Sequence, residues 1–428
     1  MNASGSEKEI ALKFIVRALH HRNYRLFFGG QSVSLIGTWM QQLAMSWLVY
    51  RLTDSAFLLG VISFSSQIPV FLFASIAGVY ADRWNRLRIL VATQAFSMIQ
   101  ALILAVLTLT GTIHVWQLIG LSVFLGMINA FDMPTRQSFV VEMIDKPEDL
   151  GNAIALNSFM FNGARLVGPA VAGLLIGLLG EGVCFLINGL SFIGIIAALL
   201  AIRVPTRKKE IRASRLWQEL RDGYSYAFGF APIRYILYQL GVISFMGMAY
   251  GVLMPVFARD ILHGGPHTLG FLMAASGIGA LTGSIYLASR RTILGLGRII
   301  SIASAIFGAG VILFSFSTIL VFSLLMMFVA GFGMIVQLAS SNTILQSIVD
   351  EDKRGRVMSI YATFLFGMAP IGSLIMGALA SWIGAPNTLI ISGFTCIIGA
   401  LFFAVKLPRI RKEVRPIYAR MGIISEVE

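Results

Sequence analysis

The chain has 428 residues, of which 57% are hydrophobic and 12% are charged, and its formal net charge is +13. A soluble protein of this length cannot bury so much apolar surface, so the composition indicates a chain whose solvent is lipid. The positive charge alone is compatible with nucleic-acid binding, but its placement along the chain argues against that class.

Residues 1–25 are polar and mildly amphipathic, so we expect a cytoplasmic leader and no cleavable signal peptide. Twelve apolar stretches follow, each able to cross a bilayer as a helix, because about 20 residues rising 1.5 Å each span the hydrocarbon core. We therefore expect an all-α membrane protein with helices at Leu26–Tyr50, Ser55–Ala81, Ile89–Gly111, Val115–Gln137, Ile154–Leu179, Gly182–Ile202, Tyr235–Ala258, Leu269–Ser289, Ile299–Phe316, Ile319–Gln346, Val357–Ile383 and Thr388–Val405.

The longest polar interruption divides these helices into two sets of six. It covers residues 203–234 and carries several Arg and Lys residues, followed by Leu216, Trp217, Leu220, Tyr224 and Phe228 at near-helical spacing. This pattern predicts a short amphipathic helix lying on the membrane surface. The expected organisation is a six-helix bundle at 26–202, the central loop, a second bundle at 235–405 and a basic tail at 406–428.

Basic residues are distributed unevenly between the loops. If the N-terminus is cytoplasmic, every Lys and Arg lies on the inner side except Arg51, Arg165 and Arg259. The positive-inside rule then places both termini in the cytoplasm. The lipid bilayer, and not a nucleic acid, is the partner that this distribution favours.

The two halves of the chain repeat. Gly151, Gly163 and Gly168 in the first half align at one constant offset with Gly355, Gly367 and Gly372 in the second. Two like halves in parallel orientation predict an interface between them near the midplane, and rocking about it would expose a cavity to each side in turn.

The turn after the second expected helix reads G-x-x-x-D-R-x-N-R-x-R, with Gly78, Asp82, Arg83, Arg86 and Arg88 at its defined positions. This loop, the twelve helices and the two-half repeat resemble the major facilitator superfamily over roughly residues 20–405. Asn85 stands where that superfamily has a glycine, and it keeps a residue that tolerates left-handed geometry.

The resemblance implies that this loop forms a gate. Asp82 would face the first turn after Gly355, where the unpaired N–H groups of a helix start favour a carboxylate. Arg86 would pair with Asp132, and together these contacts would hold the inner gate shut.

The fifth expected helix carries Gly163, Gly168, Pro169 and Gly173. This spacing resembles the superfamily's antiporter motif, with Ala172 in place of one glycine. The glycines permit close helix approach and the proline bends the helix, although ordinary small-residue packing explains the same pattern.

Charged residues inside the expected spans are few. Arg165 lies near mid-bilayer, where a charge is costly, so it should face a wet cavity or a partner. It either ties helices together, or lines a cavity where it binds an anionic group or senses a proton-coupled charge change. Asp132 is the one carboxylate inside an expected span, and Arg136 follows one turn later. Two roles are open for Asp132, a gate latch and a proton site, and the sequence does not decide between them. Further polar candidates for a mostly apolar and aromatic cavity are Gln31, Gln41, Asn157, Gln337 and Asn342.

Enzymatic chemistry finds no support in the sequence. No His or Cys pair has metal-ligand spacing inside a span, and there is no phosphate-binding loop, so we expect no metal and no cofactor. Three strings beginning at Asp132, Gly151 and Trp217 are similar to a bacterial efflux branch that includes the enterobactin exporter and macrolide efflux proteins.

The resulting expectation is a proton-driven exporter of a hydrophobic or amphipathic small molecule, such as a drug or siderophore, in the bacterial inner membrane. A monomer is the default for the fold. The alternatives are a lysophospholipid flippase and a non-transporting scaffold or receptor, against which the gate motif argues.

Overall fold

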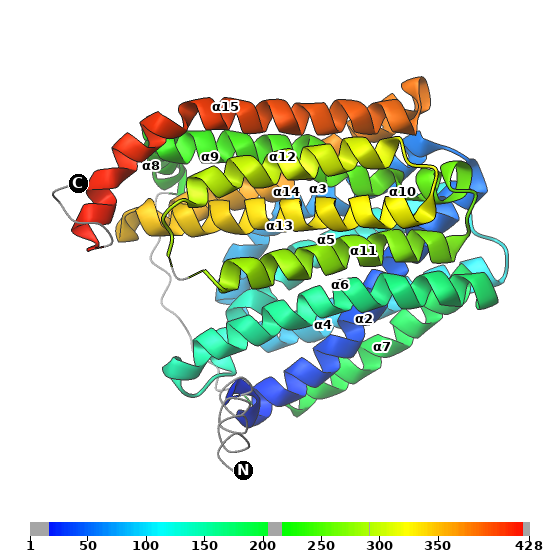
Figure 1. Ribbon diagram of the computed structural model, residues 1–428. Coiled ribbons are helices and arrows are strands. Elements are labelled where there is room, and N and C mark those ends of the chain that lie inside the picture. The colour runs from blue at the N-terminus through cyan, green and yellow to red at the C-terminus, as the bar shows by residue number, and fades with distance from the viewer. Residues whose placement is uncertain (1–16, 204–215, 291, 423–428) are drawn as a thin grey trace, which may run out of the picture. The chain divides into compact units, whose positions relative to one another are not determined.

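The computed structural model describes residues 17–203, 216–290 and 292–422, and every regular element among them is helical. Figure 1 shows the elements in chain order. In the first half they are η1 (Arg17–His20), α2 (Arg22–Thr53), α3 (Ala56–Arg83), α4 (Arg86–Leu109), α5 (Val115–Glu142), η2 (Pro147–Asp149), α6 (Leu150–Leu179) and α7 (Glu181–Ala201). In the second they are α8 (Leu216–Gly229), α9 (Ala231–Val242), η3 (Ile243–Gly247), η4 (Met248–Leu253), α10 (Met254–Val256), η5 (Phe257–Ile261), α11 (Pro266–Ala288), α12 (Leu296–Ser315), α13 (Leu320–Ile348), α14 (Glu351–Ile383) and α15 (Ala385–Arg420).

Membrane-spanning potential follows the expected pattern with one difference. Eleven helices of the described chain are long and apolar enough to cross a membrane. The expected first span does form a helix, α2, but it is not among the eleven. Gln31, Gln41 and Gln42 lower its hydropathy. A multi-pass membrane protein is therefore established, whereas the count of twelve spans is not.

The chain forms two compact units, one of residues 1–48 and 65–211 and the other of 49–64 and 212–428. The expected division at the central loop is thus modified, because the end of α2 and the start of α3 group with the second unit. Residues 204–215 of that loop lie outside the described chain.

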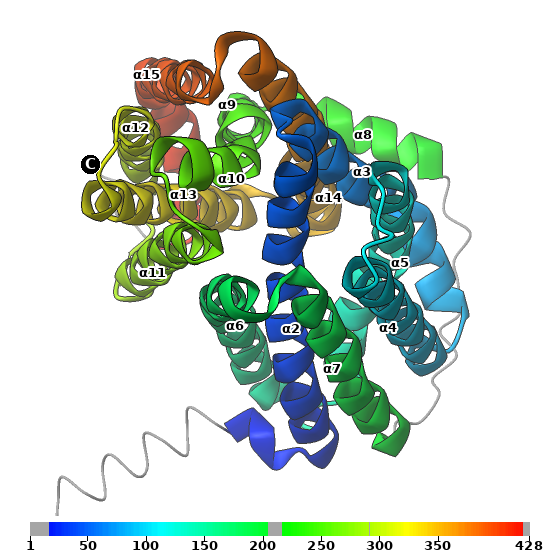
Figure 2. The same ribbon diagram turned by 90° about the vertical axis from the view of Figure 1, so that its right-hand side faces the viewer.

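In the first unit, α4 packs on α5 and α7, and α6 packs on α7. Figure 2 shows α2 running beside α6 and α7. Glycines allow this close approach: a Cβ built at Gly30 would lie 2.9 Å from Ile195 Cα, and one at Gly168 would lie 2.6 Å from Trp39 Cβ. Backbones packed this closely gain dispersion contacts that lipid cannot replace.

In the second unit, α13 packs between α11 and α12, and α12 packs on α15. The repeat is visible in the packing of α14, because a Cβ at Gly372 would lie 1.7 Å from the backbone oxygen of Phe245 in η3. Gly168 of α6 meets α2 in the same way. The aligned glycines therefore occupy corresponding helix contacts in the two units.

The expected helix Tyr235–Ala258 is present but irregular. It is divided into α9, the π segments η3 and η5, the 3-10 segment η4 and the short α10. Pro255 has no N–H to donate, and Gly247 and Gly251 weaken the helix nearby. Side chains from other helices bond to this region, and Ser392 Oγ donates to Met246 O at 2.8 Å. Hydrophobicity alone predicts a span but not these interruptions.

The last helix is longer than expected. The segment 406–428, expected to be a tail, continues α15 as far as Arg420, although Pro408 and Pro416 lie within it. Leu407, Ile410 and Val414 recur at helical spacing and are buried in the core of the second unit. This apolar face explains why the helix continues beyond the span.

Candidate functional site

One polar cluster in the first unit is centred on Asp132 of α5, which is 4% exposed. Thr93 Oγ1 and Gln94 Nε2 on α4 donate to Asp132 Oδ1 at 2.9 and 2.7 Å. Arg136 Nη2 lies 3.3 Å from Asp132 Oδ2, one turn further along α5. Asp132 precedes the end of α5 by about 15 Å at the usual rise per residue. These partners surround a carboxylate inside a membrane helix, where an unpaired charge would be costly.

The expected pair between Arg86 and Asp132 is not what the structure shows. Arg86 instead forms an ion pair with Glu142 at the end of α5. The reason is geometric: Arg86 begins α4 and Glu142 ends the antiparallel α5, whereas Asp132 lies nearly three turns further in. The sequence expectation placed the end of this helix at Gln137, and it therefore missed Glu142.

The other residues of the gate motif lie at the α3–α4 turn. Asn85 is extended, with φ −67° and ψ 111°, and its side chain caps α4 by accepting from Arg88 N at 3.1 Å. It thus replaces the expected glycine as a cap and not as a left-handed residue. Gly78 lies within α3, and Gly355 and the Arg88 side chain are exposed. The side chains of Asp82 and Arg83 lie outside the described residues, as does the contact expected between Asp82 and the helix at Gly355.

A second charged position is Arg165, at the middle of α6. Its guanidinium lies over the ring of Trp39 from α2, 5.9 Å from the ring centroid, and Phe161 meets the same ring edge-on at 5.7 Å. Within the described residues no carboxylate pairs with Arg165. Pro169 has no N–H for the backbone carbonyl of Arg165, so this carbonyl loses its ordinary helical donor.

The four residues of the expected helix bend have different roles. Gly168 packs tightly against Ile36 and Trp39, whereas a Cβ at Gly163 would meet nothing within 4 Å. Pro169 and Gly173 are buried inside α6. Gly168 therefore permits close helix approach, as expected. Gly163 does not, and the expectation for Gly163 was wrong.

The polar candidates for a cavity are mostly in packed helix contacts. Gln41 donates to Gln100 Oε1 at 2.9 Å and accepts from Asn188 Nδ2 at 2.8 Å, so it ties α2 to α4 and α7. Gln31 is also buried. Gln337 is buried, donates to Ser341 Oγ at 3.2 Å and has no partner for its Oε1 among the described residues. The half-buried positions are Asn157 and Asn342, and Asn342 accepts from Gln346.

A cluster around His21, which sequence reasoning missed, joins the start of α2 to the α5–α6 turn. His21 Nδ1 lies 3.1 Å from Asp145 Oδ2, and its Nε2 lies 2.9 Å from Asp149 Oδ2. Arg17 also pairs with Asp149. Burial opposes protonation of His21, but hydrogen bonds and the charges of the two carboxylates outweigh it and raise the pKa of His21. The signal was a histidine in the leader and two aspartates in one short loop.

A second missed cluster lies in the second unit, where the end of α2 meets η5. Tyr50 donates to Asp260, and Arg259 pairs with Asp54. The Arg259 guanidinium also lies over the Tyr50 ring, 5.6 Å from its centroid. Asp54 adopts a φ of +49°, which few side chains tolerate. In the sequence, the signal for this position was one basic residue, Arg259, beside Asp260 in an expected outer loop.

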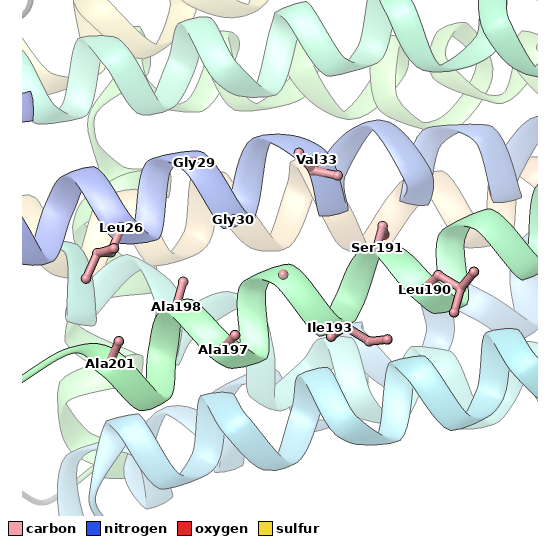
Figure 3. A pocket seen from close by; sticks show the side chains of 11 residues that line it. Leu26, Gly29, Gly30, Val33, Leu190, Ser191, Ile193, Ala197, Ala198 and Ala201 are labelled. Carbon is pink, nitrogen blue, oxygen red and sulfur yellow. The ribbon is translucent and has the colours of Figure 1, made fainter.

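A shallow depression of about 760 Å³ lies between α2 and α7. Figure 3 shows its lining of small and apolar side chains, among them Leu26, Val33, Leu190 and Ile193. Ser191 supplies its one side-chain hydroxyl, and none of the expected site residues lines it. It lacks the convergent polar groups that orient a ligand. No group of three or more metal-ligating side chains occurs in the described chain.

Comparison with known proteins gives consistent results. The chain is 25% identical to the staphyloferrin A transporter of Staphylococcus aureus, covering 91% of this chain and 98% of that one. It is 24% identical to the multidrug efflux pump Tap of Mycolicibacterium fortuitum, over 86% and 91%. It is also 23% identical to the macrolide efflux protein A of Streptococcus pyogenes, over 92% and 98%.

Solved structures agree in fold. A bacterial homologue of the human lysosomal transporter Spinster, inward-facing and unoccupied, matches with a TM-score of 0.69 at 15% identity, over 91% of this chain and 98% of that chain. A POT family transporter in complex with 5-aminolevulinic acid matches with a TM-score of 0.71 at 12% identity, over 91% and 96%. These proteins are transporters and not enzymes. Residues 16–420 match the family described as transmembrane secretion effector, and the chain therefore belongs to this family of the major facilitator superfamily.

Proposed function

We propose that this protein is a secondary active exporter that uses the proton gradient to move a hydrophobic or amphipathic small molecule out of the bacterial cytoplasm. Its relatives include a multidrug efflux pump and a macrolide efflux protein, and this likeness supports export. The uneven distribution of Lys and Arg supports a cytoplasmic location for both termini. We further propose that it works as a monomer in the inner membrane.

The observation that carries the proton coupling is the buried carboxylate of Asp132. Its Oδ2 faces Arg136 at 3.3 Å, and its Oδ1 accepts from Thr93 and Gln94. A proton arriving on Oδ2 would neutralise the carboxylate and release Arg136 from the ion pair. Neutralising the carboxylate would also weaken the hydrogen bonds that its Oδ1 accepts from Thr93 and Gln94, which join α4 to α5. In this way a proton can favour one conformation over another.

The gate of the proposed cycle is the α3–α4 turn. Asp82 would hold the first turn of α14 near Gly355, and the pair of Arg86 with Glu142 would fix the turn against α5. Asp132, which does not pair with Arg86 in the structure, is then free for the coupling role. A non-transporting scaffold would need neither group.

The deciding experiment is transport by purified protein in liposomes with a pH-sensitive dye inside. A macrolide, a cationic dye, a catecholate siderophore and a labelled lysophospholipid are added in turn. We expect one solute to drive proton movement in the wild type, and Asp132→Asn to stop it.

Glu413→Gln is the matched control, because it removes a carboxylate of an exposed i,i+4 pair with Arg409. Its proton movement should equal that of the wild type. Lysophospholipid crossing without proton movement would replace the exporter with the flippase alternative. If a folded protein moved neither protons nor any solute of the panel, both transport proposals would be overturned.

A further inference from the structure

The proposed exporter mechanism assigns no role to Arg165, the charged residue at the middle of α6. The neighbouring intramembrane charge, Asp132, is neutralised within its own helix by Arg136. Arg165 has no carboxylate partner within the described residues, and its guanidinium lies over the ring of Trp39. A guanidinium offers five N–H donors, and an aromatic face satisfies none of them as a hydrogen-bond acceptor. At mid-helix, such a group requires water or an anion.

The surroundings of Arg165 form a stripe along one face of α6. Asn157, Phe161 and Arg165 follow one another at intervals of four residues, so they project from the same face over about 12 Å. Phe161 is 44% exposed, and Asn157 and Arg165 are half-buried. This face therefore carries an aromatic side chain between a neutral polar group and a cation, and all three are accessible.

The helix contact beneath this stripe holds it in place. The ring of Trp39 meets Arg165 and Phe161, and the base of its side chain lies close to Gly168, where a Cβ would lie 2.6 Å from Trp39 Cβ. Leu35, Met160 and Ala164 form the buried apolar cluster next to it. Close packing at Gly168 thus holds α2 against α6 at Trp39, and such support is what a recognition site requires.

The internal repeat argues that Arg165 does not serve the fold. Gly168 and Gly372 occupy corresponding contacts, and the same alignment places Ala369 opposite Arg165. Ala369 is 6% exposed and carries no charge. The second unit therefore packs the corresponding helix without a cation at this position. A costly charge found in one repeat alone is explained by a ligand better than by packing.

We propose that Arg165, Trp39 and Phe161 form a subsite for an aromatic organic anion, and that the exported molecule belongs to this class. The carboxylate or equivalent anionic group would accept from the guanidinium, and the aromatic body would lie on Phe161 and Trp39. Asn157 would bond to a polar substituent at the far end. This inference rests on the proposed export function for its biological meaning, although binding can be measured without transport.

The test is equilibrium binding of two radiolabelled probes of equal shape, 2-naphthoate and the uncharged 2-naphthamide, to the purified full chain in lipid nanodiscs. The wild type should bind the carboxylate at least about tenfold more tightly than the amide, as expected for charge-assisted hydrogen bonds. Arg165→Gln should remove this preference, and Arg165→Lys should keep part of it. Phe161→Leu should weaken both probes by a similar factor.

Arg234→Gln is the matched control, since Arg234 also lies over an aromatic ring, that of Tyr235 at 5.2 Å, but in the second unit. It should leave the preference unchanged. Equal binding of both probes by the wild type, or an unchanged preference in a folded Arg165→Gln variant, would overturn the subsite. A carboxylate preference together with no proton movement in liposomes would refute the proposed coupling and leave the subsite standing.

Discussion

At the residue scale, the ion pair of Arg86 with Glu142 locates the gate motif relative to α5. Reversing one charge, as in Arg86→Glu, places two carboxylates together and should reduce transport strongly. The double variant Arg86→Glu with Glu142→Arg restores opposite charges at the same positions and should recover a large part of the rate. The measurement is initial transport rate per reconstituted protein, with expression and size-exclusion profiles as folding controls.

The alternative pairing, of Arg86 with Asp132, predicts a different outcome for that experiment. If Arg86 acted through Asp132, as the family resemblance implied, exchanging charges with Glu142 would rescue nothing. A null result for the double variant in a folded protein would therefore count against the observed pairing.

A second residue-scale prediction concerns Asp82. Asp82→Asn keeps the size of the side chain but removes the charge that favours a helix start. We expect transport to be lost while membrane expression is retained. Transport at the normal rate would show that Asp82 is not part of the gate.

The pKa of His21 gives a pH prediction. Because this pKa is raised above its usual 6.5, the stabilisation is fully present below about pH 6.5 and is lost as pH rises through the higher folded value. At about pH 5.5, His21→Gln should lower the melting temperature, since charge-assisted hydrogen bonds contribute about 1.5–3 kcal/mol. By about pH 8.5 the gap between variant and wild type should shrink.

The neighbouring His20 offers a control for this titration. It is exposed, and its ring bonds to a backbone oxygen, that of Arg17 at 3.1 Å. His20→Gln should change the melting temperature little, because it removes only this exposed contact. A gap for His21→Gln that is constant across the pH range would contradict a role for the charged imidazole.

The charged residues inside the spans could be found from the sequence, but their partners could not. A lone Arg165 or Asp132 is conspicuous because charge in an apolar run is rare and costly. Which carboxylate meets Arg86 depends on where α5 ends and on the rotation of two helices, and neither is encoded locally. The cluster around His21 depends on a contact between residues more than a hundred positions apart.

At the element scale, two glycines of α6 differ in their surroundings, because Gly168 contacts a neighbouring helix closely and Gly163 does not. Gly168→Ala would place a methyl group 2.6 Å from Trp39 Cβ and should destabilise the protein by about 1–3 kcal/mol. Gly163→Ala on the same helix meets open space and should be neutral or stabilising by up to about 1 kcal/mol through helix propensity. Thermal unfolding followed by tryptophan fluorescence in detergent compares the two, and equal melting temperatures would contradict the close contact.

The positions of the helices were predictable, because a membrane helix needs a long apolar run. Whether a helix is continuous or interrupted by π and 3-10 segments was not predictable. The sequence of Tyr235–Ala258 predicts one continuous helix, yet a π segment that ends at Gly247 and a 3-10 segment that contains Gly251 interrupt it. Several other glycines and prolines, such as Pro169, lie in helices that remain continuous. The difference comes from neighbouring side chains such as Ser392, which satisfy the displaced carbonyls.

At the scale of the whole molecule, the two units each contain the same helix contact, made by Gly168 in one and Gly372 in the other. This correspondence supports duplication of one bundle, the arrangement in which alternating access by rocking is possible. Such a mechanism requires that both bundles enter the membrane in the same orientation. The distribution of Lys and Arg is the evidence for that orientation, and it can be tested independently of transport.

Accessibility of single cysteines tests the orientation in both units. The native Cys184 and Cys396 are free and fully buried, so they provide a silent background. Thr112→Cys lies in the exposed turn after α4, and Thr318→Cys lies in the exposed turn after α12. With both termini in the cytoplasm, a membrane-impermeant maleimide should label both variants in spheroplasts.

Met421→Cys, at the end of α15, is the opposite arm of this experiment, because Met421 is 51% exposed on the expected inner side. It should react only after the membrane is permeabilised. Labelling of Met421→Cys in sealed spheroplasts together with protection of Thr112→Cys would show that the topology is the inverse of the expected one. Protection of Thr318→Cys alone would mean that the second unit enters the membrane in the opposite sense, and rocking of two parallel halves would then be impossible.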